Sequence, residues 1–108
     1  MPVTEHPYQT CIAKYFAMRD QLVVGQIPHE LSHTLLRIVN ELDQGKLRVA
    51  EKIAGVWQTH AWLKQAILLL FKTLPNQVMT DGLNQFFDKV SLKYQGYTEI
   101  DFRQDGVR

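Results

Sequence analysis

The segment 61–72, AWLKQAILLLFK, constrains the fold most, because its pattern is helical and its side chains are apolar on nearly every side. Only Lys64, Gln65 and Lys72 give this helix a polar face. A helix of this kind has to be covered on more than one side. The chain has 108 residues and therefore offers one modest core. We expect part of the cover to come from another subunit or from a domain outside this chain.

Two further amphipathic helices are expected before it, over residues 7–24 and 28–44, because apolar residues recur there at spacings of three and four. Gly25 ends the first helix in a short turn, and Pro28 suits the first turn of the second. The two helices should therefore be antiparallel neighbours. Their buried faces are expected to consist of Tyr8, Cys11, Ile12, Tyr15, Phe16 and Leu22 in the first helix, and Leu31, Leu35, Ile38, Val39 and Leu42 in the second.

Residues 47–59 predict a β-hairpin, because polar and apolar residues alternate on both sides of Ala54-Gly55. A last helix over residues 98–104 is predicted by Thr98 and Asp101, which have the spacing of a capping box. The path of residues 75–96 is not fixed by any pattern. The sequence therefore predicts a single domain over residues 1–108, mainly α with an α+β character: a helix hairpin, a short β-hairpin and a third, apolar helix.

Composition excludes several classes of protein. The formal net charge is +1 with both signs spread along the chain, so nucleic acid is not an expected partner. The longest apolar run, 66–71, is too short to cross a bilayer, and the first ten residues have no apolar signal region. The single Cys11 cannot form an internal disulfide, has no partner motif as a nucleophile, and is expected to be a buried free thiol. We expect a cytoplasmic protein.

One motif in the sequence suggests zinc chemistry. His29, Glu30 and His33 form a literal H-E-x-x-H, in which two imidazoles on one helix face can bind zinc while the glutamate activates water. Neither His60 nor Glu41 has the spacing that would define a third ligand. A zinc hydrolase is therefore a remote alternative, which bound zinc in the purified protein would support.

Two other pairs are weaker candidates for a site. Glu51 and His60 could act as acid and base if the hairpin brought them together, although alternating charges on a strand are more often a solvated face. Trp57 and Trp62 could form a ligand platform, although core packing is the more common role of such residues. The six glycines are scattered and form no phosphate-binding loop.

The exact residues in the second half of the chain are more informative than their periodicity. The stretches LDQGKLRVAEKIAGVWQTHAWLKQAILLLF (42–71), NQV (76–78), FFDKVSLKY (86–94) and DGVR (105–108) resemble the N-terminal part of tetrahydrodipicolinate N-succinyltransferases. Residues 47–52, 62–64 and 87–90 are the most specific pieces. Residues 1–41, which include the H-E-x-x-H motif, resemble the family only in helical character. Where the family usually has an acidic residue before the hairpin glycine, this chain has Ala54.

The resemblance implies an activity that this chain does not carry alone. The family transfers a succinyl group from succinyl-CoA to the amino group of ring-opened tetrahydrodipicolinate, in bacterial lysine and diaminopimelate synthesis. Its members are homotrimers built on a left-handed β-helix of hexapeptide repeats, and the N-terminal domain packs beside it. No hexapeptide repeat occurs in this sequence. The resemblance therefore places the CoA groove and the catalytic carboxylates outside this chain. We expect this domain to contain no catalytic residue, metal or bound cofactor, with succinyl-CoA as co-substrate of the full enzyme.

One family site residue corresponds to a position here. The resemblance implies that Arg108 is the arginine that binds the acceptor, a small dicarboxylate that a planar guanidinium can hold through two parallel hydrogen bonds. We expect the isolated domain to be inactive, and its partners to be its own β-helix domain and the neighbouring subunits of the trimer. The rival interpretation is a free-standing interaction module derived from this domain. A reading frame that continued past Arg108 into hexapeptide repeats would indicate the enzyme, and a stop codon the module.

Overall fold

The computed structural model describes residues 6–80 and 82–107 of the chain. Backbone contacts divide the chain into two compact units, Met1–Asn76 and Gln77–Arg108. Within the described residues the fold consists of α-helices and two small antiparallel strand pairs, and no β-helix is formed. The predicted fold class, mainly α with an α+β character, is confirmed. The single domain over residues 1–108 stays a prediction.

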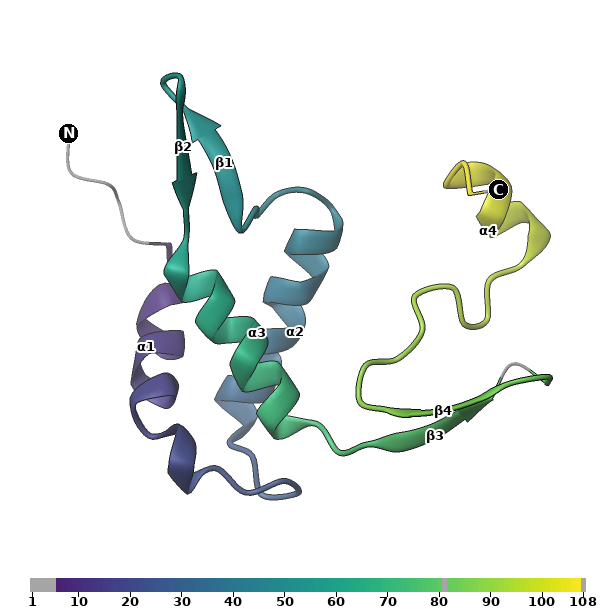
Figure 1. Ribbon diagram of the computed structural model, residues 1–108, viewed down its shortest axis with the longest axis horizontal. Helices are drawn as coiled ribbons and strands as arrows, with labels where there is room; N and C mark the ends of the chain where they lie inside the picture. The colour runs from purple at the N-terminus through teal and green to yellow at the C-terminus, as the bar shows by residue number, and fades with distance from the viewer. Residues whose placement is uncertain (1–5, 81, 108) are drawn as a thin grey trace. The chain divides into compact units, whose positions relative to one another are not determined.

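The first unit is a three-helix bundle with a β-hairpin between its second and third helices, as Figure 1 shows. Each pair of helices is in contact, so the three share one core. The elements are α1 (Gln9–Ala17), a short 3-10 helix η1 (Arg19–Gln21), α2 (His29–Asp43), β1 (Ala50–Ile53), β2 (Val56–Thr59) and α3 (Ala61–Thr73).

The core of this unit is made by one apolar stripe from each helix. The residues that α1 was expected to bury are all buried or packed against the core. In α2 the expectation is wrong at Val39, which is 38% exposed, whereas Thr34 is buried. The buried face of α2 therefore includes Thr34 in place of Val39 and is rotated slightly about the helix axis from the expected face. The fully or almost fully buried apolar side chains are Ile12, Tyr15, Leu31, Leu35, Ile38, Leu63, Ala66 and Leu69.

Helix α3 is covered on one side by the other two helices. Leu63, Ala66 and Leu69 face the core and are each 1% exposed, in the three-residue spacing of a single stripe. On the other side, Leu68 and Phe71 are 47% and 45% exposed. The described residues of the first unit therefore cover this second face only partly. The expected cover from outside the chain stays a prediction.

The first helix is shorter than its periodicity predicted. The carbonyl of Phe16 accepts a hydrogen bond from the Met18 amide and another from the Arg19 guanidinium, at 2.8 Å. The Arg19 guanidinium also lies over the Phe16 ring, 4.4 Å from its centroid. These contacts close α1 at Ala17. Leu22 then packs against the core from an extended backbone (ψ 132°), so its spacing was correct although its conformation is not helical.

The predicted first hairpin is present, with Glu51 paired to Gln58 and Lys52 to Trp57. Ala54 and Gly55 form its two-residue turn with φ angles of 51° and 80°. Positive φ at both central residues is the geometry that matches the twist of a hairpin. Ala54 is the only described residue other than glycine with a positive φ, and such a conformation costs an alanine about 1–2 kcal/mol.

The second unit contains a second hairpin that the sequence patterns did not predict. β3 (Gln77–Thr80) pairs with β4 (Gln85–Asp88), so that Val78 lies opposite Phe87 and Met79 opposite Phe86. The sequence signal for it is the Asp-Gly dipeptide at 81–82, a frequent turn sequence, although Asp81 itself lies outside the described residues.

The second unit ends in α4 (Glu99–Gln104), whose predicted capping box is confirmed. The Thr98 hydroxyl accepts from the Asp101 amide at 3.3 Å, and the Asp101 carboxylate accepts from the Thr98 amide at 2.9 Å. The bond from the Thr98 amide, and then that from its hydroxyl, lower the pKa of Asp101. The rings of Tyr94 and Tyr97, which precede the helix, pack together with the ring of Phe102 in it. None of the described side chains in 77–107 is buried.

Candidate functional site

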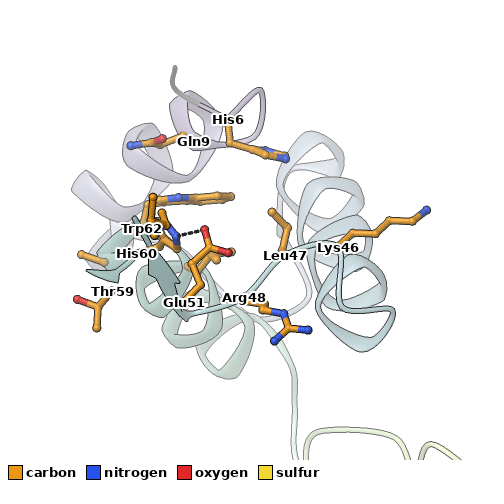
Figure 2. A pocket seen from close by; sticks show the side chains of 12 residues that line it. His6, Gln9, Lys46, Leu47, Arg48, Glu51, Thr59, His60 and Trp62 are labelled. Carbon is orange, nitrogen blue, oxygen red and sulfur yellow. Dashed lines mark hydrogen bonds and ion pairs between the residues drawn. The ribbon is translucent and has the colours of Figure 1, made fainter. Parts of the chain in front are cut away.

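The first unit carries a pocket of about 470 Å³ where the hairpin joins α3. Its walls come from the start of α1, the loop after α2, the hairpin and the first turn of α3 (Figure 2). Leu47, Ile53 and Leu63 supply apolar surface. Its polar and aromatic lining consists of His6, Gln9, Lys46, Arg48, Glu51, Thr59, His60 and Trp62.

Glu51 and His60, which were weighed as an acid and base pair, meet in this pocket. The Nε2 atom of His60 lies 2.9 Å from Oε1 of Glu51, as the dashed line in Figure 2 marks. The hairpin register explains the contact, because Glu51 lies opposite Gln58 and His60 points to the same face two residues later. An ionised carboxylate can only accept, so the ring N–H donates. The lining residues that the structure describes include no serine or cysteine. General acid and base chemistry here stays a prediction.

The two tryptophans have different environments. Trp62 is partly buried, packs against the core and stacks with the His6 ring at 5.3 Å between centroids. Trp57 is 70% exposed on the hairpin. Core packing, the expected role of both, is therefore right for Trp62 and wrong for Trp57. They do not form a shared ligand platform, because only Trp62 lines the pocket.

Two cationic side chains line one side of the pocket. They are Lys46 and Arg48, which lie in the exposed loop after α2. Figure 2 shows the Lys46 side chain extending away from the centre, whereas the Glu51 carboxylate lies within it. Among the lining residues that the structure describes, Glu51 is the only acidic one, whereas Lys46 and Arg48 are both positively charged. The described lining therefore carries more positive than negative groups.

The H-E-x-x-H motif forms the start of α2, but its glutamate, Glu30, makes a structural contact with α1. The Tyr15 hydroxyl donates to Glu30 Oε2 at 2.8 Å, which joins α1 to α2, and Lys14 lies 3.7 Å from the same oxygen. The hydrogen bond to Glu30 raises the pKa of Tyr15 above its ordinary value of 10.0. His33 accepts a hydrogen bond from the Arg37 guanidinium at 2.9 Å, while its ring stacks with that of His29 at 6.1 Å.

These contacts give the motif a structural explanation. Across residues 6–80 and 82–107, no group of three or more His, Cys, Asp or Glu side chains is placed to hold a metal ion. Of the two possible third ligands, His60 is bonded to Glu51. Glu41 has a buried carboxylate oxygen, Oε2, without a described hydrogen-bond partner, but it is not grouped with His29 and His33. Nothing in the described geometry favours a zinc hydrolase.

Cys11 is a free thiol on α1, as expected, and it is half-buried rather than fully buried. Its Sγ lies 3.5 Å from the Thr34 hydroxyl of α2. This contact explains why a threonine is tolerated on the buried stripe of α2. In the part of the chain that the structure describes, no helix is long and apolar enough to cross a membrane.

Comparison with known proteins assigns the chain to a family. The family model described as tetrahydrodipicolinate N-succinyltransferase N-terminal matches residues 7–73, which include the three-helix bundle and the pocket. The chain belongs to this family. The resemblance derived from residues 42–108 is thereby confirmed. The expectation that residues 1–41 match only in helical character is wrong, because the match begins at residue 7 and includes α1 and α2.

Several curated relatives carry the family name in full. The chain is 43% identical over 100 residues to the 2,3,4,5-tetrahydropyridine-2,6-dicarboxylate N-succinyltransferase of Pseudoalteromonas translucida, which covers 93% of this chain and 36% of that protein. It is 44% identical over 103 residues to the enzyme of the same name from Dechloromonas aromatica, covering 95% of this chain and 38% of that protein. The Legionella pneumophila (strain Corby) relative is 42% identical over 100 residues, covering 93% and 36%.

The tetrahydrodipicolinate N-succinyltransferase relatives are much longer than this chain, which spans 36–38% of their length in these alignments. The chain thus corresponds to their N-terminal domain. The family residue expected to bind the acceptor, Arg108, lies outside the described residues. The pocket at the hairpin was not predicted as a site, although two of its residues, Glu51 and His60, were considered as a pair.

Proposed function

We propose that this chain is the acceptor-substrate side of an acyltransferase that moves succinyl from succinyl-CoA to tetrahydrodipicolinate in lysine and diaminopimelate biosynthesis. The observation that carries the proposal is the identity of 42–44% over 93–95% of the chain with relatives that bear this enzyme's name. Arg108 binds a carboxylate of the acceptor. The CoA groove and the catalytic carboxylates belong to the remaining length of the enzyme, so this domain alone does not turn over substrate.

The exposed apolar surface of the second unit supports a role beside a larger partner. Val78, Phe87 and Ile100 are 69%, 68% and 66% exposed. Exposed side chains of this size, on a unit in which no described residue is buried, indicate a surface that is covered in the assembled protein. We propose that the cover is the β-helix domain of a cytoplasmic homotrimer. The isolated chain should self-associate through the same surface, and a strictly monomeric species at high concentration in sedimentation would count against this.

A chimera tests the proposal directly. The segment of the Dechloromonas aromatica relative that aligns with this chain is replaced by it, and succinyl-CoA-dependent acylation of 2-amino-6-oxopimelate is measured. We expect turnover by the chimera and none by the 108-residue chain alone. Acylation by the chain alone would contradict the proposal. A chimera that assembles without turnover would favour the rival, an interaction module derived from the same domain, which the exposed apolar surface also fits.

The role of Arg108 is tested in the active chimera. Removing one partner of a buried charge pair typically costs 2–5 kcal/mol, so Arg108→Gln should lower kcat/KM for the acceptor by about 100-fold. The KM for succinyl-CoA should not change. Arg103→Gln is the matched control, because this arginine pairs with Glu99 on the exposed surface of α4. An equal loss of kcat/KM in both variants would contradict a specific role of Arg108 in binding the acceptor.

A further inference from the structure

The pocket at the junction of hairpin and α3 has the composition of a small-molecule site. One part of its wall is apolar and aromatic, because Leu47 and Trp62 pack against the core and still line the pocket. The volume of about 470 Å³ lies within the range of ligand pockets, which are mostly apolar with a few polar groups that fix orientation. The wall comes from four separate segments of the first unit, so folding of that unit alone forms the pocket.

The charged groups at this pocket indicate the sign of the charge that a ligand would carry. The carboxylate of Glu51 is engaged by His60 at 2.9 Å. Across residues 6–80 and 82–107, neither the Lys46 nor the Arg48 side chain has a hydrogen bond or an ion pair. Two cationic groups without a partner therefore remain at the mouth, each on a flexible stem that can turn inward. A guanidinium binds a carboxylate through two parallel hydrogen bonds.

We propose that this pocket binds a small organic carboxylate with an apolar body. The carboxylate pairs with Arg48, with Lys46 as a second positive charge at the mouth. The apolar body lies against Trp62 and Leu47. The chemistry requires both parts, because acetate would leave the apolar wall uncovered and a neutral amide would leave the cations without a partner. The proposal concerns the first unit alone and stands independently of the transferase activity proposed above.

Trp62 provides a reporter for binding. The other tryptophan, Trp57, is 70% exposed and outside the pocket, so the Trp57→Phe variant of the 108-residue chain leaves one indole at the site. Hexanoate is titrated against its fluorescence, and backbone amide shifts are followed by NMR. For a ligand of this size we expect a Kd on the order of 1 mM. The saturable shifts should map to residues 46–51 and 59–63.

Matched probes separate the two parts of the interaction. Hexanamide and acetate should each bind at least about tenfold more weakly than hexanoate, and inorganic phosphate should not compete, because each lacks one of the two required features. Arg48→Gln should weaken hexanoate binding about tenfold or more. Arg37→Gln, a change at an arginine of α2 outside the pocket, should leave the Kd unchanged.

Several results would overturn the proposal. These are no saturable change in Trp62 fluorescence up to about 20 mM hexanoate, an equal affinity for hexanamide, or shifts that map to the exposed apolar side chains of residues 77–107. An unchanged Kd in Arg48→Gln would also overturn it, provided that circular dichroism shows the variant to be folded. None of these outcomes depends on whether the chimera described above is active.

Discussion

Both units of this chain contain a β-hairpin and helical structure, but only the first has buried side chains among the described residues. The first unit places its helices so that eight apolar side chains are buried together. The second unit has two paired strands and a well-capped helix, yet none of its described side chains is buried. Backbone hydrogen bonds and caps define local structure, but burial of apolar surface supplies most of the free energy that stabilises a fold. We therefore expect the first unit to fold by itself and the second to need a covering surface.

Separating the units should have the largest effect. We expect a fragment of residues 6–76 to keep a cooperative thermal transition with a Tm within a few degrees of that of the full chain. A peptide of residues 77–108 should show no cooperative transition, because a two-stranded hairpin and a six-residue helix are marginal in water without a core. Circular dichroism melts of both pieces check this. A cooperative thermal transition in the peptide of residues 77–108 would contradict the expected difference between the two units.

A pair of truncations applies the same contrast to single side chains. Leu35 is 2% exposed in the bundle, so Leu35→Ala should lower the free energy of unfolding by about 2–5 kcal/mol. Phe87 is 68% exposed in β4, so Phe87→Ala should change it by less than about 0.5 kcal/mol. Urea titrations followed at 222 nm give both values. A large loss from Phe87→Ala would show that the second unit contributes to the global stability of this chain.

The hairpin turn of the first unit offers a stabilising change. Ala54 has a φ of 51°, and asparagine tolerates this conformation better than alanine. We expect Ala54→Asn to stabilise the hairpin by about 1 kcal/mol, which corresponds to about fivefold slower amide exchange in β1 and β2. Ala50→Asn is the matched control, since it places the same residue within a strand, where it is disfavoured. Faster exchange in Ala54→Asn would mean that the turn is not strained.

The smallest effect concerns the contact between α1 and α2 at high pH. The hydrogen bond to Glu30 raises the pKa of Tyr15 in the folded state, so its neutral form is favoured by folding. The resulting stability is fully present below the ordinary value of 10.0 and is lost as the pH rises through the higher pKa of the folded state. The wild-type chain should thus lose stability above pH 10 relative to Tyr15→Phe. Urea titrations at pH 8, 10 and 11 measure the difference, and parallel curves would contradict it.

The sequence predicted the elements that have a local cause. Periodicity placed α2 and α3 within one residue of their observed bounds, and Thr98 with Asp101 predicted the cap of α4. Ala54-Gly55 predicted a turn that the structure has. These features depend on side chains a few residues apart, so the sequence contains their full physical cause. The end of α1 was not predicted, because Leu22 packs against the core from an extended backbone.

The pocket was only partly predictable, because some of its contacts join segments that are distant in the sequence. Glu51 and His60 could be paired once the hairpin was assumed, since two residues on one face of a hairpin are neighbours. His6 and Trp62 could not, because their contact requires α1 to lie beside α3. The exposure of Trp57 and Val39 also escaped prediction. Whether an apolar residue is buried depends on which element lies over it.

The sequence alone determined α2, α3, α4, the first hairpin and, through the identity of its residues, the family to which the chain belongs. Only the tertiary structure decided which apolar residues form the core, that Glu30 joins two helices rather than presenting a free carboxylate to a metal, and that four segments enclose a pocket beside Trp62. The physical reason is that propensity, capping and turn geometry act over a few residues. Burial and charge pairing depend on segments that are distant in the chain and meet only after folding.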